Sequence, residues 1–339
     1  MAVRVAINGL GRIGKLVLWH YITTKPENIE IVAANGGSGT VEDLVYMLKY
    51  DSVHGKFPVP VEGVSADILK VGEQEIKLVT ERDPAKLRWK ELGVDIVLEC
   101  TGKFTKRADA GKHLTAGARK VLISAPSKDA DKTIVMGVNH NSYNPEKDDI
   151  ISNASCTTNC LAPVMKVLEE RFGVERALVT TVHAYTSSQV TIDRKKPGKH
   201  RRGRAAAVNI IPTTTGAAIA TTKVIPSLVG KMDALALRVP VPDGAITDIS
   251  ATLKREVTVE EVNRAFEEAS QQELKGILEI SYEELVSTDI LGNPHSSIVD
   301  GLSTIVVDRR GVKVLAWYDN EFGYSRRLLE LAQFVAERL

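Results

Sequence analysis

The sequence predicts an α/β fold that begins with a Rossmann-type dinucleotide-binding domain. A short apolar run at 3–7 leads into the glycine-rich turn Gly9-Leu-Gly-Arg-Ile-Gly14 and then into a helical pattern. Further strand patterns follow at 29–34, 76–79, 96–99 and 120–124. Helical stretches separate several of these strands, as a doubly wound parallel sheet requires.

The composition is that of a two-domain globular protein. The 339 residues are 43% hydrophobic, which suffices for a substantial core. Lys plus Arg number 44 against 43 Asp plus Glu, so the net charge of +1 gives no overall attraction to nucleic acid or membrane. Three cysteines cannot form a disulfide framework, and a strand pattern follows the initiating Met directly. We therefore expect a cytoplasmic protein.

Each glycine of the first turn has its own expected role. Gly9 permits the tight turn, Gly11 lets the backbone approach a pyrophosphate, and Gly14 allows the helix to pack closely on the strand. Ligands of such sheets bind beyond the carboxyl ends of the strands. The other residues expected to contact the cofactor from these positions are Arg12, Ile13, Asn35, Thr101, Gly102 and Ser124.

The end of the second strand bears on the choice between NAD and NADP. An acidic residue there hydrogen-bonds the adenosine ribose and repels a 2′-phosphate. This chain instead reads Asn35-Gly36-Gly37-Ser38-Gly39. One barrier to NADP is therefore missing, and Ser38 with the loop N–H groups is able to hold a phosphate oxygen. The alternative is a flexible glycine turn that has no bearing on the cofactor.

The run Ser152-Asn-Ala-Ser-Cys156-Thr-Thr-Asn-Cys160 points to a reactive thiol. An apolar helical pattern starts here, so we expect Cys156 at a helix N-terminus, where free N–H groups and the helix dipole lower the pKa of a thiol. His183 lies 27 residues later, at the end of a strand-like run, where a base can meet that thiol. A core cysteine is the alternative for Cys156 and the expected state of Cys160.

Six collinear segments resemble those of the phosphorylating glyceraldehyde-3-phosphate dehydrogenase family. They are 8–14, 152–159, 183–186, 209–217, 238–240 and 317–325. The resemblance implies a dinucleotide-binding domain over 1–155 plus 320–339 and a catalytic α/β domain, with a mostly antiparallel sheet, over 156–319. It also implies a homotetramer, a C-terminal helix over 325–339, and oxidation of glyceraldehyde 3-phosphate with inorganic phosphate in glycolysis, gluconeogenesis or the Calvin cycle.

The same resemblance implies roles for individual residues. Cys156 is similar to the nucleophile that forms a hemithioacetal and then a thioester, and His183 to its imidazolium partner and later base. The residues that resemble the family's site for the substrate phosphate are Thr186, Arg202 and Arg238. Those that resemble its site for inorganic phosphate are Ser155, Thr157, Thr215 and Gly216. The remaining cofactor contacts implied are Asn320 for the carboxamide, Tyr324 near the nicotinamide ring, and Arg82 and Thr101 on the adenosine side.

One segment, 184–208, departs from the family pattern. Many NAD-specific members carry Leu-Pro after the residue equivalent to Asp193, whereas this chain reads Asp193-Arg-Lys195-Lys-Pro. Cations therefore replace apolar residues where a 2′-phosphate would lie, and Gly36 stands in place of the repelling carboxylate. Both departures favour NADP as a cofactor, with NAD use retained.

Several alternatives stay open at this point. Erythrose-4-phosphate dehydrogenase has nearly the same site. The basic run at 194–204 also fits a solvated face or an RNA-binding patch, although the near-neutral chain and the lack of interleaved aromatic residues leave RNA binding as a minor activity or a scaffold role. His54 and His113 are interpreted as surface or core residues. The spacing of His, Cys and carboxylates gives no metal site.

Overall fold

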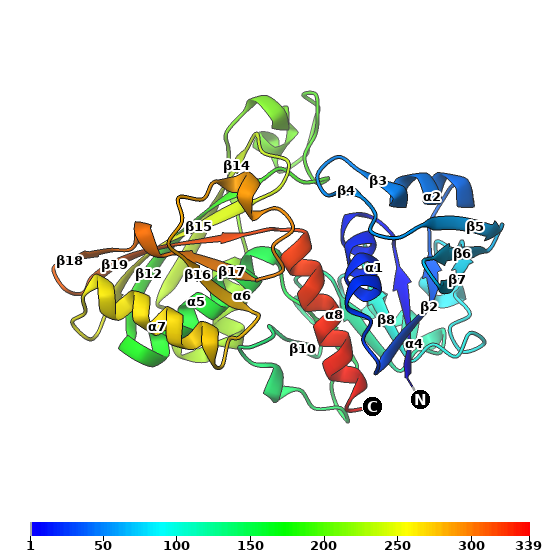
Figure 1. Cartoon of the computed structure of the whole chain (residues 1–339), viewed down its shortest axis with the longest axis horizontal. Coiled ribbons are helices and arrows are strands. Elements are labelled where there is room, and N and C mark those ends of the chain that lie inside the picture. The colour runs from blue at the N-terminus through cyan, green and yellow to red at the C-terminus, as the bar shows by residue number, and fades with distance from the viewer. Residues whose placement is uncertain (1) are drawn as a thin grey trace. The chain divides into compact units, whose positions relative to one another are not determined.

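The computed structural model of the chain describes residues 2–339, which form two compact units (Figure 1). Unit 1 extends to Met136 and adds His140–Ser155 and Ser325–Leu339. Unit 2 consists of Gly137–Asn139 and Cys156–Tyr324. Among the described residues, no helix is both long and apolar enough to cross a membrane.

Unit 1 is built on a nine-stranded sheet with the strand order β10-β11-β9-β8-β1-β2-β7-β6-β5. Six strand pairs from β10 to β7 are parallel, and β5, β6 and β7 pair antiparallel at one edge. The expected parallel Rossmann-type sheet is therefore confirmed. Its strands are β1 (Val3–Asn8), β2 (Ile29–Asn35), β5 (Val61–Ser65), β6 (Ile68–Val71), β7 (Gln74–Val79), β8 (Ile96–Glu99), β9 (Lys120–Ile123), β10 (Lys132–Thr133) and β11 (Ile150–Ser152).

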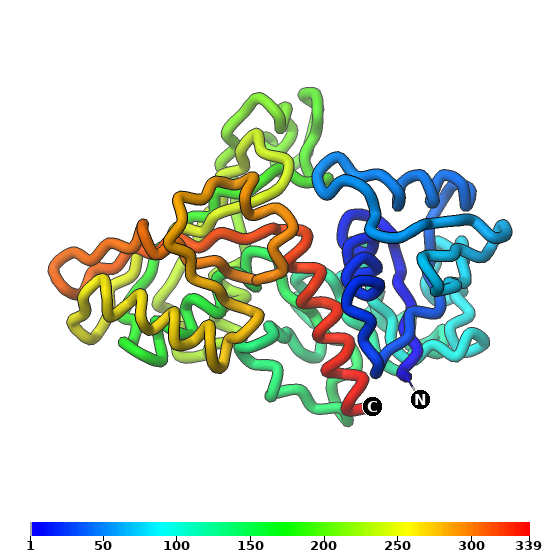
Figure 2. The backbone as a smooth tube through the Cα atoms, viewed as in Figure 1, coloured from blue at the N-terminus to red at the C-terminus, as the bar shows by residue number. Residues whose placement is uncertain are grey.

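The helices of unit 1 cover an apolar sheet core. They are α1 (Arg12–Thr24), α2 (Val41–Lys49), α3 (Arg107–Ala110), α4 (Lys112–Thr115) and most of α8 (Phe322–Ala336), and a small hairpin joins β3 (Tyr50–Asp51) to β4 (Gly55–Lys56). The C-terminal helix, expected from Ser325, begins three residues earlier because Asp319 Oδ1 accepts the N–H groups of Glu321 and Phe322. Figure 2 shows this helix beside α1, where Ser325 Oγ donates to the carbonyl of Ile13.

Unit 2 contains an eight-stranded, mostly antiparallel sheet with the order β13-β14-β12-β15-β19-β17-β16, and β18 pairs with β19. Only β12–β14 and β16–β17 are parallel pairs within this sheet, so the expectation for the second domain is confirmed. The strands are β12 (Val174–Ala184), β13 (Ile211–Thr214), β14 (Met232–Val239), β15 (Ala245–Leu253), β16 (Leu278–Ser281), β17 (Ser297–Asp300), β18 (Ile305–Val307) and β19 (Gly311–Tyr318).

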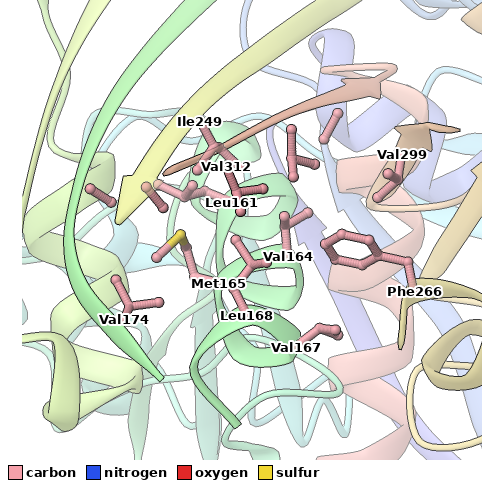
Figure 3. Packing of buried hydrophobic residues seen from close by; sticks show 14 of the residues in the cluster. Leu161, Val164, Met165, Val167, Leu168, Val174, Ile249, Phe266, Val299 and Val312 are labelled. Atoms are coloured by element: carbon pink, nitrogen blue, oxygen red, sulfur yellow. The ribbon is translucent and has the colours of Figure 1, made fainter. Parts of the chain in front are cut away.

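The core of unit 2 forms around the helix that starts at Cys156. This helix, α5 (Cys156–Phe172), buries Leu161, Val164 and Leu168 against sheet residues such as Ile249 and against α7 (Val259–Gln271) (Figure 3). A shorter helix, α6 (Ala217–Val224), follows β13. Burial of these side chains fixes the axis of α5 and therefore the place of its first residue.

Candidate active site

The structure brings the predicted nucleophile and base of unit 2 into contact. Cys156 is the first residue of α5, and His183 lies near the end of β12. The Cys156 Sγ and His183 Nε2 atoms are 3.3 Å apart. A thiol at a helix start and an imidazole at a strand end therefore meet, as their places in the sequence predict.

The protonation state of this pair differs from the expectation. Burial raises the pKa of the Cys156 thiol, although Arg238 and the Thr157 N–H act in the opposite direction. Burial also lowers the pKa of His183, with a further contribution from the Arg238 charge, to about 3. These shifts oppose the expected thiolate and imidazolium, because desolvation outweighs the effect of the helix terminus and favours the neutral forms of both side chains.

Two arginines lie beside the imidazole. Residue 238 of β14 pairs in register with residue 183 of β12, which places Arg238 Nη1 2.8 Å from His183 Nδ1 and 2.7 Å from the carbonyl oxygen of Ala184. Arg238 Nε is buried and has no hydrogen-bond partner among residues 2–339. Arg202 donates to Thr213 Oγ1 at 2.8 Å, and its charge also lowers the pKa of His183.

The sequence-predicted threonines occupy different surroundings. Thr157 is buried, with its Oγ1 3.0 Å from the hydroxyl of Tyr318. Thr186 Oγ1 lies 2.9 Å from Ser188 Oγ, in the loop after β12. Thr215 Oγ1 accepts the N–H of Ala217 at the start of α6, where Gly216 is exposed and a Cβ would meet no atom within 4 Å. Ser155 is the last residue of unit 1 before α5.

Sequence reasoning missed a buried tyrosine next to the catalytic pair. The Tyr318 hydroxyl is 2.8 Å from Thr181 Oγ1, and its ring meets that of His183 edge-on with centroids 5.9 Å apart. Burial raises the pKa of Tyr318 well above its ordinary value, so it stays a neutral hydroxyl. The sequence offered one signal for this polar cluster. Thr181 lies two residues before His183 on the same strand, and residues two apart on a strand share a face. Tyr318 belongs to the 317–325 segment on a distant strand, and no local pattern places it beside His183.

Unit 1 contains a cavity of about 550 Å³ at the carboxyl ends of its parallel strands. Eight predicted cofactor residues line it: Gly9, Gly11, Asn35, Gly36, Gly37, Ser38, Arg82 and Thr101. Seven further lining residues were not predicted: Asn8, Leu10, Met47, Glu81, Cys100, Lys103 and Phe104. The lining does not include the predicted residues Arg12, Ile13, Gly14, Gly102 and Ser124.

The three glycines of the first turn have the surroundings that their predicted roles require. Gly9 has a φ of +100°, in the region that favours glycine. A Cβ on Gly14 would collide with the carbonyl oxygen of Gly9, so α1 can pack this closely on β1 only without a side chain there. A Cβ on Gly11 would meet nothing within 4 Å, which leaves room above the turn.

Arg12 has a strong protein partner. Its guanidinium pairs with the Asp51 carboxylate, which Lys15 Nζ also approaches to 3.1 Å. Burial alone would raise the pKa of Asp51, but these cations and the N–H groups of Val53 and His54 hold it well below its usual range. Arg12 thus ties the start of α1 to the β3–β4 hairpin.

The other predicted cofactor residues lie in unit 2. Asn320 is buried, and its Oδ1 has no hydrogen-bond partner in the described chain. Tyr324 is buried in the first turn of α8. Lys195 is exposed in the loop after β12, where Arg204 and Asp193 form an ion pair at 2.6 Å.

The fold and these two sites define a nucleotide-binding oxidoreductase. Residues 3–107 match the family described as glyceraldehyde 3-phosphate dehydrogenase, NAD binding domain, and residues 155–320 match its C-terminal domain. The chain therefore belongs to the glyceraldehyde-3-phosphate dehydrogenase family.

Known relatives match the chain over its whole length. The glyceraldehyde-3-phosphate dehydrogenase of Geobacillus stearothermophilus is 54% identical over 100% of this chain and 99% of its own. Glyceraldehyde-3-phosphate dehydrogenase 1 of Bacillus subtilis is 53% identical, with the same two coverages of 100% and 99%. Glyceraldehyde-3-phosphate dehydrogenase 2 of Streptomyces avermitilis is 51% identical over 100% of both chains. The resemblance of the six segments to this family is thereby confirmed.

Proposed function

We propose that the enzyme oxidises glyceraldehyde 3-phosphate with inorganic phosphate to 1,3-bisphosphoglycerate, and runs the reverse reaction, through a thioester on Cys156. The observation that carries this proposal is the 3.3 Å contact between Cys156 Sγ and His183 Nε2, with Arg238 beside the imidazole. The names of the full-length relatives favour glyceraldehyde 3-phosphate over erythrose 4-phosphate as the substrate.

The first step is attack of Cys156 on the aldehyde carbon. Since the thiol is protonated at rest, His183 Nε2 takes its proton as the S–C bond forms. The N–H of Cys156, at the start of α5, stabilises the developing oxyanion. His183 then returns this proton to the oxyanion, which gives the hydroxyl of the hemithioacetal, and removes it again as a base when the hydride leaves. A bound nicotinamide dinucleotide supplies the hydride acceptor.

Through the arginines, the bound substrate phosphate should also change the pKa of His183. Arg238 and Arg202 lower the pKa of His183 in the ligand-free chain. A phosphate dianion bound to both guanidinium groups cancels much of this charge, so the pKa of His183 rises and the imidazole becomes a stronger base. We assign Thr186 to the same phosphate, and Ser155, Thr157, Thr215 and Gly216 to the inorganic phosphate that cleaves the thioester.

The residues present fit a dinucleotide cofactor. The cavity of unit 1 is lined by backbone groups of the glycine turn, and Gly11 leaves open space there for a pyrophosphate. The unpaired Asn320 Oδ1 is an acceptor suited to the carboxamide of nicotinamide, and Tyr324 adds an aromatic ring in the same stretch. We further assign Arg12, Ile13, Gly102 and Ser124 to the cofactor site, and Arg82 and Thr101 to its adenosine side.

We propose that NADP is accepted, and favoured over NAD, because no carboxylate follows β2. Gly36 and Ser38 are exposed at the rim of the cavity, and Lys195 is exposed in the long loop. The one carboxylate of the lining, Glu81, is engaged elsewhere: its Oε1 accepts the N–H groups of Arg82 and Asp83 at 2.7 and 2.9 Å. These bonds hold the Glu81 carboxylate on its own loop after β7 and not on the loop that follows β2.

Steady-state kinetics with NAD and NADP, each with and without phosphate, test these assignments together. Gly36→Asp should lower kcat/KM for NADP at least about tenfold through charge repulsion and leave NAD within about twofold. Lys195→Leu should act in the same direction, with the exposed Lys199→Leu as the matched control. Negligible turnover with NADP at concentrations at which NAD saturates would exclude NADP use.

The nucleophile has its own test. Cys156→Ser should reduce the dehydrogenase rate by several orders of magnitude, because a hydroxyl is a far weaker nucleophile and forms no thioester. The buried Cys160→Ser, one turn further along α5, is the matched control and should retain most of the rate. An unchanged rate in Cys156→Ser would refute the assignment.

We also propose that four copies assemble in the cytoplasm. Two exposed leucines on neighbouring strands of the unit 2 sheet, Leu178 and Leu235, support an assembly surface. Light scattering after size exclusion should give four times the chain mass of 36.9 kDa. RNA binding by the exposed basic loop is proposed only as a minor activity, and loss of RNA retention at modest salt would count against it.

A further inference from the structure

A buried chain of hydrogen bonds lies beneath the cofactor cavity of unit 1, and the catalytic steps above do not use it. It links Trp89, His113 and Glu99 to the cavity residues Asn8 and Thr101. The side chains of His113 and Glu99 are 0% exposed. His113 was interpreted from the sequence as a surface or core residue. It is a core residue with three polar neighbours.

The donors and acceptors of this chain have a defined order. Trp89 Nε1 lies 3.0 Å from His113 Nδ1, and an indole nitrogen can only donate. Nδ1 of the imidazole is therefore the acceptor, and the ring proton resides on Nε2. That Nε2–H donates to Glu99 Oε2 at 3.1 Å. Trp89 thus selects the tautomer of His113, and His113 orients Glu99.

Four donors converge on the Glu99 carboxylate, which matches its capacity as an acceptor. Oε2 accepts from His113 and, at 2.5 Å, from Asn8 Nδ2. Oε1 accepts the backbone N–H of Thr101 at 2.8 Å and also the Thr101 hydroxyl. The residues before Glu99 in β8 are apolar and fully buried. A buried acidic group is a poor means of stabilising a core, so its place at the cavity needs a different reason.

The bonds of Glu99 fix several loops of the cavity at once. Thr101 packs against the glycine turn so closely that a Cβ on Gly9 would lie 2.9 Å from Thr101 Cγ2. Asn8 Oδ1 accepts from Asn35 Nδ2 at 2.8 Å, and Asn35 Nδ2 also donates to the carbonyl of Glu81 at 2.7 Å. One carboxylate thereby connects the last residues of β1 and β2 to the segments that follow β7 and β8.

We propose that Glu99, oriented by Trp89 and His113, is the positioning residue of the cofactor cavity. It holds Thr101, the glycine turn and Asn35 in the relative places that the dinucleotide requires before the dinucleotide binds. Preorganisation of this kind lowers the cost of binding and leaves the chemistry at Cys156 unchanged. The inference rests on the proposed location of the cofactor in this cavity.

The experiment compares four variants by cofactor Kd, by calorimetry, and by steady-state kinetics. Glu99→Gln places an amide N–H among donors and should raise the Kd and KM for the cofactor about tenfold or more. The KM for glyceraldehyde 3-phosphate and kcat should stay within about twofold. His113→Leu should raise the cofactor KM several-fold. His113→Gln restores a donor toward Glu99 and should recover most of that loss. Tyr143→Phe, a buried side chain of unit 1 away from the cavity, is the matched control.

A merely structural role gives a different result. It lowers the melting temperature and the active fraction but leaves the cofactor Kd of the folded protein unchanged, and this outcome in Glu99→Gln and His113→Leu would overturn the proposal. If Glu99→Gln does not fold, Trp89→Phe removes the indole N–H that sets the tautomer of His113, together with one buried ring, and should still raise the cofactor Kd over that of wild type. No change in Kd would then count against the proposal.

A further variant separates this inference from the location of the cofactor. Gly11→Leu adds a side chain to open space in the cavity, at a φ of −71° that any residue adopts. It should abolish cofactor binding. Binding that persists in Gly11→Leu refutes the location of the cofactor itself. Loss of binding in Gly11→Leu, with a normal Kd in Glu99→Gln, refutes only the positioning role.

Discussion

At the scale of single residues, desolvation governs the protonation of the proposed catalytic pair. A helix N-terminus lowers the pKa of an exposed thiol, but at the partly buried Cys156 and the buried His183 desolvation favours the neutral forms. The register of β12 and β14 places Arg238 in direct contact with the imidazole, where its charge lowers the pKa of His183 further.

His183 should make the folded chain sensitive to acid. Its pKa is about 3 in the folded chain and near the ordinary 6.5 when unfolded, so below pH 6.5 the unfolded state binds the extra proton. Stability from this group is complete above 6.5 and is lost as the pH falls toward 3. His183→Asn should remove a loss of roughly 1.4 kcal/mol per pH unit in that range. Urea unfolding at pH 7, 6 and 5 measures the free energy of unfolding of both proteins. The same dependence on pH in the wild type and in His183→Asn would contradict the prediction.

Arg238 should affect phosphorylated and unphosphorylated substrates differently. Arg238→Leu removes a guanidinium group that we propose to bind the substrate phosphate, so kcat/KM for glyceraldehyde 3-phosphate should fall about 100-fold or more. Glyceraldehyde, which lacks the phosphate, should lose far less, because the variant also relieves the charge that weakens His183. Equal losses for the two aldehydes would show that Arg238 acts only on the fold of the site.

At the scale of elements, local sequence signals account for the central strands of unit 1. The five predicted strands correspond to β1, β2, β7, β8 and β9: four of them are largely buried apolar runs, whereas β7 buries only Ile76. The β5–β6 edge was missed because residues such as Glu62, Gly63 and Lys70 interrupt its pattern. Cys156 and His183 could be placed from the sequence because one begins a helix and the other lies near the end of a strand. Tyr318 and Glu99 could not, since their partners come from strands or helices far along the chain.

Helix α7 offers a measurable case of such a local signal. Thr258 Oγ1 accepts the N–H of Glu261, and Glu261 Oε2 accepts the N–H of Thr258, which forms a capping box at the helix start. Thr258→Ala should lower the free energy of unfolding by about 1 kcal/mol. Cofactor and substrate KM values should not change. Chemical denaturation tests the stability, and a shift in either KM would contradict a purely local effect.

At the scale of the whole molecule, each unit has its own apolar core. The core of unit 2 is drawn from one continuous stretch after Cys156, whereas that of unit 1 combines residues from both ends of the chain. Helix α8 contributes Leu328, Leu329, Leu331 and Val335 to unit 1, and all four are 0% exposed. Their burial is worth roughly 6–12 kcal/mol, which is comparable to the net stability of a domain.

Removal of α8 should therefore unfold unit 1. A chain that ends at residue 324 should bind a hydrophobic dye strongly and lose cofactor binding, because the apolar surface under α8 is exposed. A chain that ends at residue 336 keeps the helix and is the control. Retained cofactor binding in the shorter chain would show that the first 155 residues are sufficient for the cavity.

The place of α8 in the fold also affects the order in which the two units can fold during synthesis. Residues 325–339 are synthesised after all of unit 2, yet they complete the core of the unit whose sheet is synthesised first. While unit 2 is being synthesised, the apolar surface of unit 1 that α8 later covers therefore stays exposed. Such a nascent chain is a natural client for a holding chaperone, and the delay ends only when the terminal helix leaves the exit tunnel.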